Sequence, residues 1–182
     1  DQPVDNIISE RLMHLLTEIL NVSWKPLTAN GEPRKFLALA NVGLYYAIKE
    51  SAIVPDVMLS MDVEIKNRVP VKSDLTYFLW DHGKLPEVAI EIVSPNSGNE
   101  DNEKLHRYER IGIQYYAVID PSRVLSDDLL RTFELQKGAY QPCVDDFFPE
   151  VGLGLMPWAG EYGKMYLDSW VRWCDADGVL LP

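Results

Sequence analysis

The sequence predicts a mixed α/β domain, and three features of the chain lead to that prediction. An amphipathic helix comes first, apolar segments typical of strands follow it, and a strand–helix–strand unit precedes a mostly β tail. Within residues 5–20 the apolar side chains recur at helical spacing, at Ile8, Leu12, Leu15, Leu16 and Ile19. Pro26 and the turn-forming residues 30–33 then end this first helix.

Three strands are predicted next, at residues 36–48, 57–63 and 88–93. The last of them has the clearest pattern, Val-Ala-Ile-Glu-Ile-Val. Ser97 and Glu100 have the spacing of a capping box, so we expect a helix to begin there and to end before Gly112. Residues 115–119 form another short apolar strand. Two strands joined by a helix in this way are expected to be parallel, with a right-handed crossover.

The tail is predicted to be mostly β. Residues 129–135 and 139–142 flank Lys137-Gly138 and form a hairpin, and a further strand follows at 151–155. Residues 169–174 are expected to form a short helical or irregular aromatic segment. Because no repeat or linker interrupts the chain, we expect a single domain over residues 1–182. Its core covers about residues 5–121, and its β-rich tail covers about 122–182.

Composition narrows the classes of function. Of the 182 residues, 17 are Lys or Arg and 28 are Asp or Glu, so the formal net charge is −11. Tight, non-specific nucleic-acid binders are usually basic, which argues against that class. The two cysteines, Cys143 and Cys174, belong to no zinc motif or disulfide framework. Without a membrane-spanning stretch or a signal-peptide pattern at residues 1–5, we expect a cytoplasmic protein with no membrane partner.

Two acidic residues suggest a metal site. Glu91 lies in the middle of an apolar strand, and its neighbours on the same side, Ala89 and Val93, are apolar. A buried carboxylate is costly unless it is paired or bound to a metal, although Glu91 on an edge strand would face solvent. Asp56 follows Pro55 at the start of the preceding strand, a position that also suits a simple turn. If neighbouring strands bring the two acids together, they suit one Mg²⁺ ion.

Lys104 is the third candidate. Glu100 and Lys104 are four residues apart, as in an ordinary ion pair on a solvated helix face. Alternatively, the helix packs on the sheet and places Lys104 over Glu91, where an ammonium group orients water or stabilises a phosphate. The tryptophans, in contrast, are predicted to be core or interface anchors rather than base-stacking platforms: Trp24, Trp80, Trp158, Trp170 and Trp173.

Several of these segments together resemble a known family. They are Pro55-Asp56-Val57, the run from Pro86 to Pro95 with Glu91, the pattern Glu100-x-x-x-Lys104-Leu105-x-x-Tyr108-x-x-x-Gly112, and Val118-Ile-Asp-Pro121. The combination resembles the bacterial putative restriction endonuclease family of the PD-(D/E)XK nuclease superfamily, most firmly over residues 54–121. The resemblance implies a restriction endonuclease-like mixed sheet, built from a helix, three antiparallel strands, a helix and a parallel strand. A C-terminal β-rich extension would follow it.

The resemblance also implies roles for individual residues. Asp56 and Glu91 would be the metal-binding carboxylates, with the Ile92 backbone carbonyl as a further ligand, and Mg²⁺ or Mn²⁺ as the cofactor. The superfamily's lysine usually stands two residues after the acid, where this chain has Val93, so Lys104 is nominated instead. An acid on the first helix, Glu10 or Glu18, is a further candidate, and the resemblance does not decide between them.

The leading hypothesis is therefore a divalent-metal-dependent endonuclease that hydrolyses phosphodiester bonds, with DNA as its substrate. To offset the acidity, cations would have to form one patch, for which the candidates are Lys66, Arg68, Lys72, Lys84, Lys104, Arg107 and Arg110. The alternative is a catalytically inactive nuclease fold that serves as a homo-oligomeric interaction module, with a homodimer expected. A third hypothesis makes Asp56 and Glu91 the acid pair of a glycoside hydrolase, which would act without metal.

Overall fold

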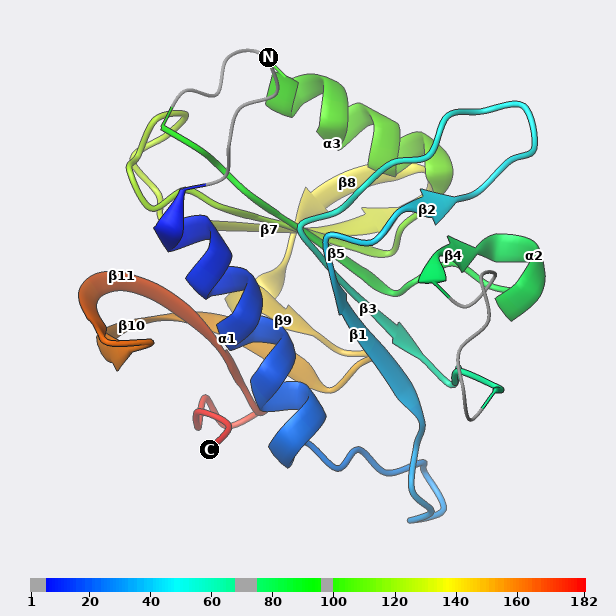
Figure 1. The fold of residues 1–182 in the computed structure, drawn as a ribbon, viewed down its shortest axis with the longest axis horizontal. Helices are drawn as coiled ribbons and strands as arrows, with labels where there is room; N and C mark the ends of the chain where they lie inside the picture. Colours follow the sequence, from blue (N-terminus) through cyan, green and yellow to red (C-terminus); the bar gives the residue numbers. More distant parts are fainter. Residues whose placement is uncertain (1–5, 68–74, 96–99) are drawn as a thin grey trace.

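A six-stranded mixed sheet forms the centre of the molecule. The computed structural model describes residues 6–67, 75–95 and 100–182, and the strand order of its main sheet is β1-β3-β5-β6-β7-β8. The first part of the fold contains the following elements: α1 (Ile7–Ser23), β1 (Phe36–Ala40), β3 (Val57–Met61), β5 (Val88–Ile92), α3 (Glu100–Ile111) and β6 (Tyr115–Ile119). β1, β3 and β5 are antiparallel neighbours, and β6 runs parallel to β5. This confirms the predicted mixed α/β fold, including its order of elements (Figure 1).

Local sequence explains where several elements begin and end. Asn6 caps α1, because its side-chain oxygen accepts a hydrogen bond from the Ser9 N–H at 2.9 Å. Gly112 ends α3 with a φ of 97°, which a residue without a side chain adopts without strain. The capping box predicted at Ser97 lies outside the described residues, so it stays a prediction.

The C-terminal part is β-rich, as predicted. It contains β7 (Leu130–Gln136), β8 (Ala139–Pro142), the short 3₁₀ helix Val144–Asp146, β9 (Phe147–Phe148), β10 (Leu153–Tyr162) and β11 (Met165–Cys174). β7 and β8 form the expected hairpin, and both residues of its turn, Lys137 and Gly138, have positive φ, as two-residue hairpin turns require. β9, β10 and β11 form a separate three-stranded sheet.

Two sequence-based expectations were wrong. Residues 36–48 do not form one strand, because the chain leaves β1 and then forms the two-residue strand β2 (Leu44–Tyr45). β2 pairs in parallel with β4 (Tyr77–Phe78), which leads into the short helix α2 (Leu79–His82). Residues 169–174 are not helical or irregular but belong to β11. Side chains on both faces of this stretch are buried or nearly so, which hides the two-residue alternation that identifies most strands.

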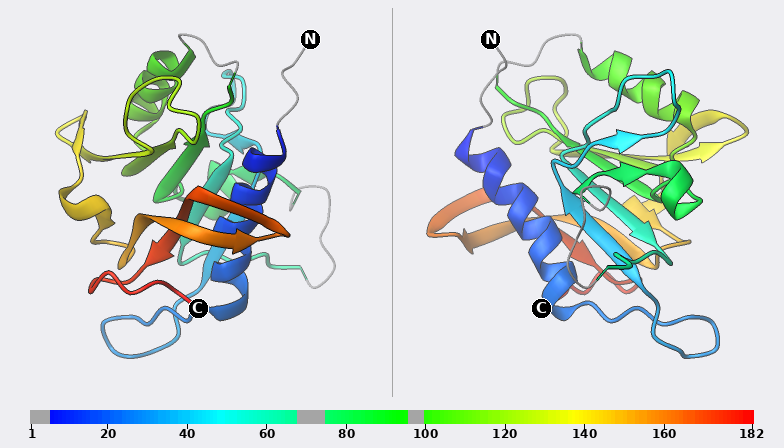
Figure 2. Two further views of the ribbon diagram at one scale, coloured as in Figure 1. Left: turned by 90° about the vertical axis from the view of Figure 1, so that its left-hand side faces the viewer. Right: turned by 45° about the vertical axis from the view of Figure 1, so that its right-hand side comes forward.

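The main sheet has a hydrophobic core on each face. Alternate side chains of β5 enter the two cores: Val88, Ile90 and Ile92 enter one, and Ala89 and Val93 enter the other. The first core lies under α1 and the β9–β11 sheet, and it includes the fully buried Trp170 and Trp173. The second lies under α3 and the β2–β4 pair. Figure 2 shows α1 beside the β10–β11 hairpin and α3 on the other side of the main sheet.

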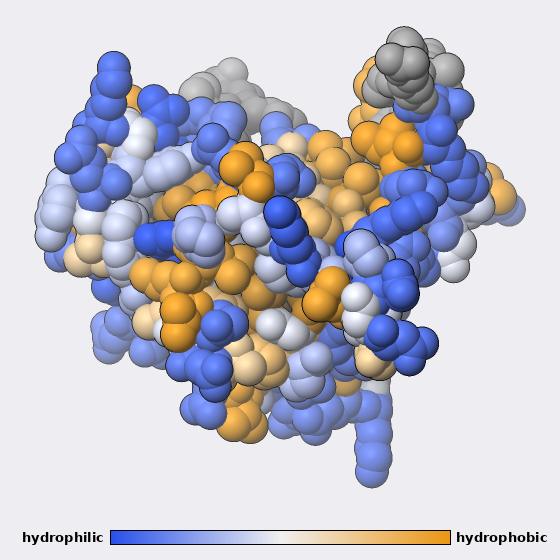
Figure 3. Space-filling model, turned by 90° about the horizontal axis from the view of Figure 1, so that it is seen from below, coloured by the Kyte–Doolittle hydropathy of each residue, from blue (hydrophilic) through white to orange (hydrophobic). Residues whose placement is uncertain are grey.

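The surface is mostly polar. Seen from below, hydrophilic side chains form much of the outline and apolar side chains lie between them (Figure 3). Within the described residues, no helix is long and apolar enough to cross a membrane.

The first core depends on the inward face of α1. Leu16 is completely buried there, so Leu16→Ala is expected to lower the free energy of unfolding by about 2–5 kcal/mol through lost contacts and a cavity. Val22 lies on the same helix with 76% of its surface exposed, so Val22→Ala is the matched control and should change stability little. Urea denaturation of the three proteins measures both effects. Equal stabilities for Leu16→Ala and wild type would contradict this core.

Candidate active site

Asp56 and Glu91 face each other across two neighbouring strands. β3 and β5 are antiparallel with Val57 opposite Ile90, and continuing that register by one residue places Asp56 opposite Glu91. Side chains directly opposite in an antiparallel pair lie on the same face, with Cβ atoms about 5 Å apart. That face carries Met58, Ala89 and Val93 and lies under α3. The structure thus brings together the two acids that the sequence singled out.

Asp56 is held in place by the backbone of β5. The Ile92 N–H donates to its Oδ2 at 2.6 Å. The next N–H, that of Val93, donates instead to Ile119 on β6. Because the N–H and C=O of one strand residue face the same neighbour, the Ile92 carbonyl lies on the edge of β5 that faces Asp56. The carbonyl proposed as a ligand therefore lies on the same side as Asp56.

Glu91 is a buried acid with two side-chain partners. Its exposed fraction is 3%, the Tyr108 hydroxyl donates to Oε1 at 2.6 Å, and the Lys104 ammonium lies 3.2 Å from Oε2. Burial, the largest cause, and the charge of Asp56 together raise the pKa of Glu91 to about 8, although Lys104 and Tyr108 oppose the shift. The Asp56 contribution means that the two carboxylates lie close enough to repel each other.

α3 supplies both partners of Glu91. Lys104 and Tyr108 are four residues apart, so they lie on one face of the helix, one turn from each other. Lys104 therefore packs over the acid, and 41% of its side chain is exposed, so its ammonium group lies between Glu91 and solvent. The Glu100 side chain lies outside what the structure describes, so the predicted Glu100–Lys104 pair stays a prediction.

Tyr108 is the residue that sequence reasoning missed. A tyrosine among the apolar side chains of a helix is expected to be buried, and Tyr108 is fully buried. Burial and the neighbouring Glu91 raise the pKa of its hydroxyl well above the usual range, so it remains a hydrogen-bond donor to that acid. The sequence feature that could have identified it is a polar hydroxyl four residues after Lys104, one helical turn along the same face.

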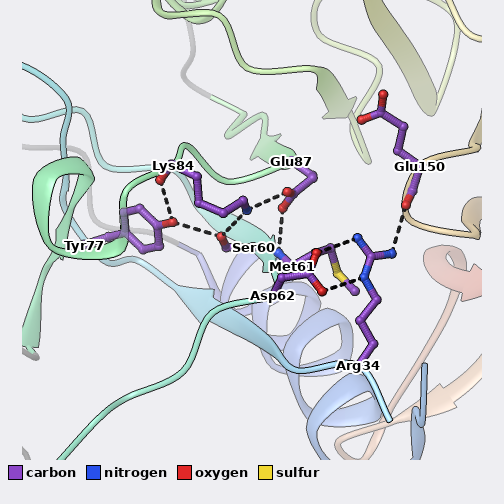
Figure 4. Close-up of polar contacts among 8 residues, drawn as sticks. All are labelled: Arg34, Ser60, Met61, Asp62, Tyr77, Lys84, Glu87 and Glu150. Atoms are coloured by element: carbon purple, nitrogen blue, oxygen red, sulfur yellow. Dashed lines mark hydrogen bonds and ion pairs between the residues drawn. The ribbon is translucent and has the colours of Figure 1, made fainter. Parts of the chain in front are cut away.

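The structure gives the other candidate residues different partners. Glu10 pairs with Arg11 and His14, and Glu18 accepts a hydrogen bond from Tyr162, so both helix-one acids have other partners. Lys84 lies at the opposite end of the strands, where it contacts Ser60 and Glu87 (Figure 4).

The predicted patch of cations is therefore divided. Arg68 and Lys72 lie outside the described residues. Lys104, Arg107 and Arg110 remain together on α3.

The donor set fits a hard divalent cation. Asp56, Glu91 and the Ile92 carbonyl offer oxygen atoms only, which suits Mg²⁺ or Mn²⁺ completed by water molecules. A cation between the acids would also relieve the repulsion that raises the pKa of Glu91. Within residues 6–67, 75–95 and 100–182, no three His, Cys, Asp or Glu side chains gather into a metal cluster. The fit therefore depends on the two carboxylates together with backbone and water oxygens.

Comparison with known proteins identifies the class of protein. A family model described as Uma2, putative restriction endonuclease, matches residues 3–152. The chain belongs to that family. Restriction endonuclease-like families generally use divalent metals.

A solved structure shows the same type of fold. It is a putative nuclease belonging to DUF820 from Anabaena variabilis ATCC 29413, 14% identical in sequence. The match covers 77% of this chain and 69% of that one, with a TM-score of 0.51. A search of curated proteins finds no match.

The raised pKa of Glu91 predicts how stability depends on pH. In the metal-free protein the folded state favours protonated Glu91, whose pKa moves from the ordinary 4.5 to about 8. This contribution to stability is complete below pH 4.5 and is lost as the pH rises through 8. Between about pH 5 and 8, wild type should therefore lose more thermal stability than Glu91→Gln, which cannot ionise. Melting curves of both proteins in a chelator measure the difference, and parallel pH profiles would refute the assignment.

Proposed function

We propose that this protein is a divalent-metal-dependent endonuclease that hydrolyses phosphodiester bonds in DNA. The observation that carries the proposal is the convergence of Asp56, Glu91 and Lys104 from three separate elements. An acid pair directly opposed on neighbouring strands, with a lysine at its open side, has the groups that metal-assisted hydrolysis needs. Membership of the putative restriction endonuclease family supports the reaction class and suggests DNA as the substrate.

Each residue has a distinct role in this mechanism. Asp56, Glu91 and the Ile92 carbonyl would hold the metal, and the Ile92 N–H keeps Asp56 in position. A bound Mg²⁺ or Mn²⁺ ion would supply Lewis acidity toward the phosphate and lower the pKa of the attacking water. Lys104 is exposed enough to donate hydrogen bonds to oxygens of that water or of the phosphate. Tyr108 is a positioning residue, because it orients Glu91 through a hydrogen bond.

Glu91 must give up a proton to bind the metal. Its pKa of about 8 means that the metal-free protein is largely protonated there at neutral pH. Metal binding therefore competes with a proton and strengthens as the pH rises. Lys104 and Tyr108 favour the ionised carboxylate, which lessens the cost of that deprotonation.

Loss of a metal ligand or of the lysine is expected to abolish DNA cleavage. With Mn²⁺ or Mg²⁺, wild type should nick supercoiled plasmid, and Asp56→Asn and Lys104→Met should each lower the rate at least about 10²-fold. The matched controls, Asp127→Asn and Lys25→Met, change exposed residues and should nick like wild type. Equal nicking by all five proteins would trace the activity to a contaminant. No nicking by wild type would favour the non-catalytic interaction module.

Metal binding can be tested without any substrate. Excess Mn²⁺ should raise the melting temperature of wild type, because a ligand at about 100 times its Kd stabilises the folded state by about 2.7 kcal/mol. Asp56→Asn should lose this shift, and Asp127→Asn should keep it. An equal shift in Asp56→Asn would place the metal elsewhere.

Tyr108→Phe separates positioning from ligation. It removes the hydroxyl that orients Glu91 but leaves both carboxylates in place. We expect it to bind Mn²⁺ about 10-fold to 100-fold more weakly than wild type while still saturating, as for other residues that orient metal ligands. Titration calorimetry measures the affinity, and an affinity equal to that of wild type would refute the positioning role.

A further inference from the structure

Three aromatic rings form a row on the outer face of the β2–β4 pair. Leu44 and Tyr77 point inward from the two strands into the second core. The next residues, Tyr45 and Phe78, are paired in the register and point outward, with ring centroids 5.1 Å apart. Trp80 on α2 stacks on Phe78 at another 5.1 Å. The row therefore combines three short elements into one aromatic surface.

This row contains two of the exposed large aromatic side chains, Tyr45 and Trp80. Trp80 has 53% of its surface exposed, whereas Trp170 and Trp173 are fully buried. Tyr45, at the other end of the row, is 37% exposed, so both ends of the row are open to solvent. A flat partner that continues the stack would cover them.

Two cationic side chains of α3, Arg107 and Arg110, which we call the cationic rim, lie beside the loop that follows Tyr45. The next residue, Tyr46, lies under the Arg107 guanidinium, which is 5.8 Å from the ring centroid. Arg107 also donates to the Ser51 carbonyl at 2.6 Å, which fixes its position beside the loop after β2. A groove lies here between α3 and that loop, lined by Tyr46, Glu50, Arg107, Arg110 and Ile111. Figures 1 and 2 show β2 between α3 and the β4–α2 segment.

The rim leads to the candidate active site. Lys104, Arg107 and Arg110 follow one another on α3 at three-residue intervals, which is about 4.5 Å of helix axis per step. Lys104 is the residue that contacts Glu91. Glu50 lies in the same groove and repels anions, so phosphate contacts are confined to the arginine side. The cations thus run along α3 from Lys104, at the acid pair, to Arg107 and Arg110, beside the loop that follows Tyr45.

We infer that this surface binds an unpaired segment of a nucleic-acid strand. Its phosphates contact the α3 cations and its bases continue the stack of Tyr45, Phe78 and Trp80. The inference rests on the proposed nuclease function and names its substrate class, which is single-stranded or locally unpaired nucleic acid. Stacking on aromatic rings is tolerant of sequence and requires bases that are free of a complementary strand.

The net charge of −11 supports stacking as the source of affinity. Proteins that hold duplex DNA depend mainly on many phosphate contacts, which an acidic chain with a few clustered cations does not provide. Base stacking is not an ionic interaction, so the overall acidity weakens it little. An exposed aromatic row beside a short cationic rim is the combination that such a chain can use.

The test is the affinity for a labelled oligothymidylate and for a duplex of equal length, measured by fluorescence anisotropy in EDTA so that nothing is cleaved. Wild type should bind the single strand more tightly.

Trp80→Ala and Tyr45→Ala should each weaken that binding about tenfold, and Trp80→Phe should retain most of it. Arg110→Ala should reduce the salt dependence by about one charge. Tyr166→Ala is the control, since Tyr166 is 70% exposed on β11, at the opposite side of the molecule.

The outcomes separate this inference from the proposed function. Equal affinity for single strand and duplex, or unchanged affinity in both Trp80→Ala and Tyr45→Ala, would overturn the inference even if the protein nicks plasmid. Single-strand binding that depends on Trp80, in a protein that cleaves nothing, would support the inference and remove the nuclease function. If Trp80→Ala left nucleic-acid binding intact but dissociated a dimer in ultracentrifugation, the row would be a protein interface and the inference would fail.

Discussion

The chain buries the carboxylate of Glu91 directly opposite that of Asp56, and the surrounding structure compensates for this costly arrangement. Burial and the charge of Asp56 both disfavour ionised Glu91, and two side chains of α3 oppose them. This balance depends on the register of β3 and β5, because a shift of one residue would turn Glu91 toward the core under α1. It depends equally on α3, which must cross the sheet where Lys104 and Tyr108 both reach the same acid. Both the register of β3 and β5 and the position of α3 are therefore needed to hold this pair of carboxylates in place.

The two ends of the same strands have different electrostatic environments. At the end away from the site, Glu87 accepts a hydrogen bond from the Met61 N–H and pairs with Lys84. Lys84 also donates to Ser60, so acid, base and hydroxyl satisfy one another there (Figure 4). At the site, Lys104 offsets only part of the rise in the pKa of Glu91 that burial and the charge of Asp56 cause. The strands are therefore tied at one end by polar groups that satisfy one another, and at the other end they hold an acid pair in which the pKa of Glu91 is raised.

The sequence predicted the parts of this site that disturb a local pattern. Glu91 interrupts an apolar strand whose alternation also indicates the face it occupies, and Asp56 marks the start of the next strand in the sheet. Tyr108 was not recognised because a buried tyrosine suits an apolar helix face, and only the three-dimensional path of α3 brings its hydroxyl to Glu91. The strand nature of residues 169–174 was hidden for a related reason. With both faces covered, Trp170, Val171 and Trp173 give no alternation to detect. The role of Tyr108 and the strand at residues 169–174 both depend on contacts between segments that are distant in sequence.

Net charge and local charge give opposite expectations for a protein that acts on nucleic acid, and the distances involved decide which applies. Charges are screened over about 8 Å at physiological ionic strength, so acids on the far side of the molecule contribute little at the site. Within that range, a phosphate bound as proposed would meet Lys104 and Arg107, as well as any cation held by Asp56 and Glu91. The bulk acidity then acts mainly on long-range encounter, where it slows association and discourages non-specific adhesion to duplex DNA. A chain with this distribution of charge gains little from tracking along DNA and must rely on close contacts at the site.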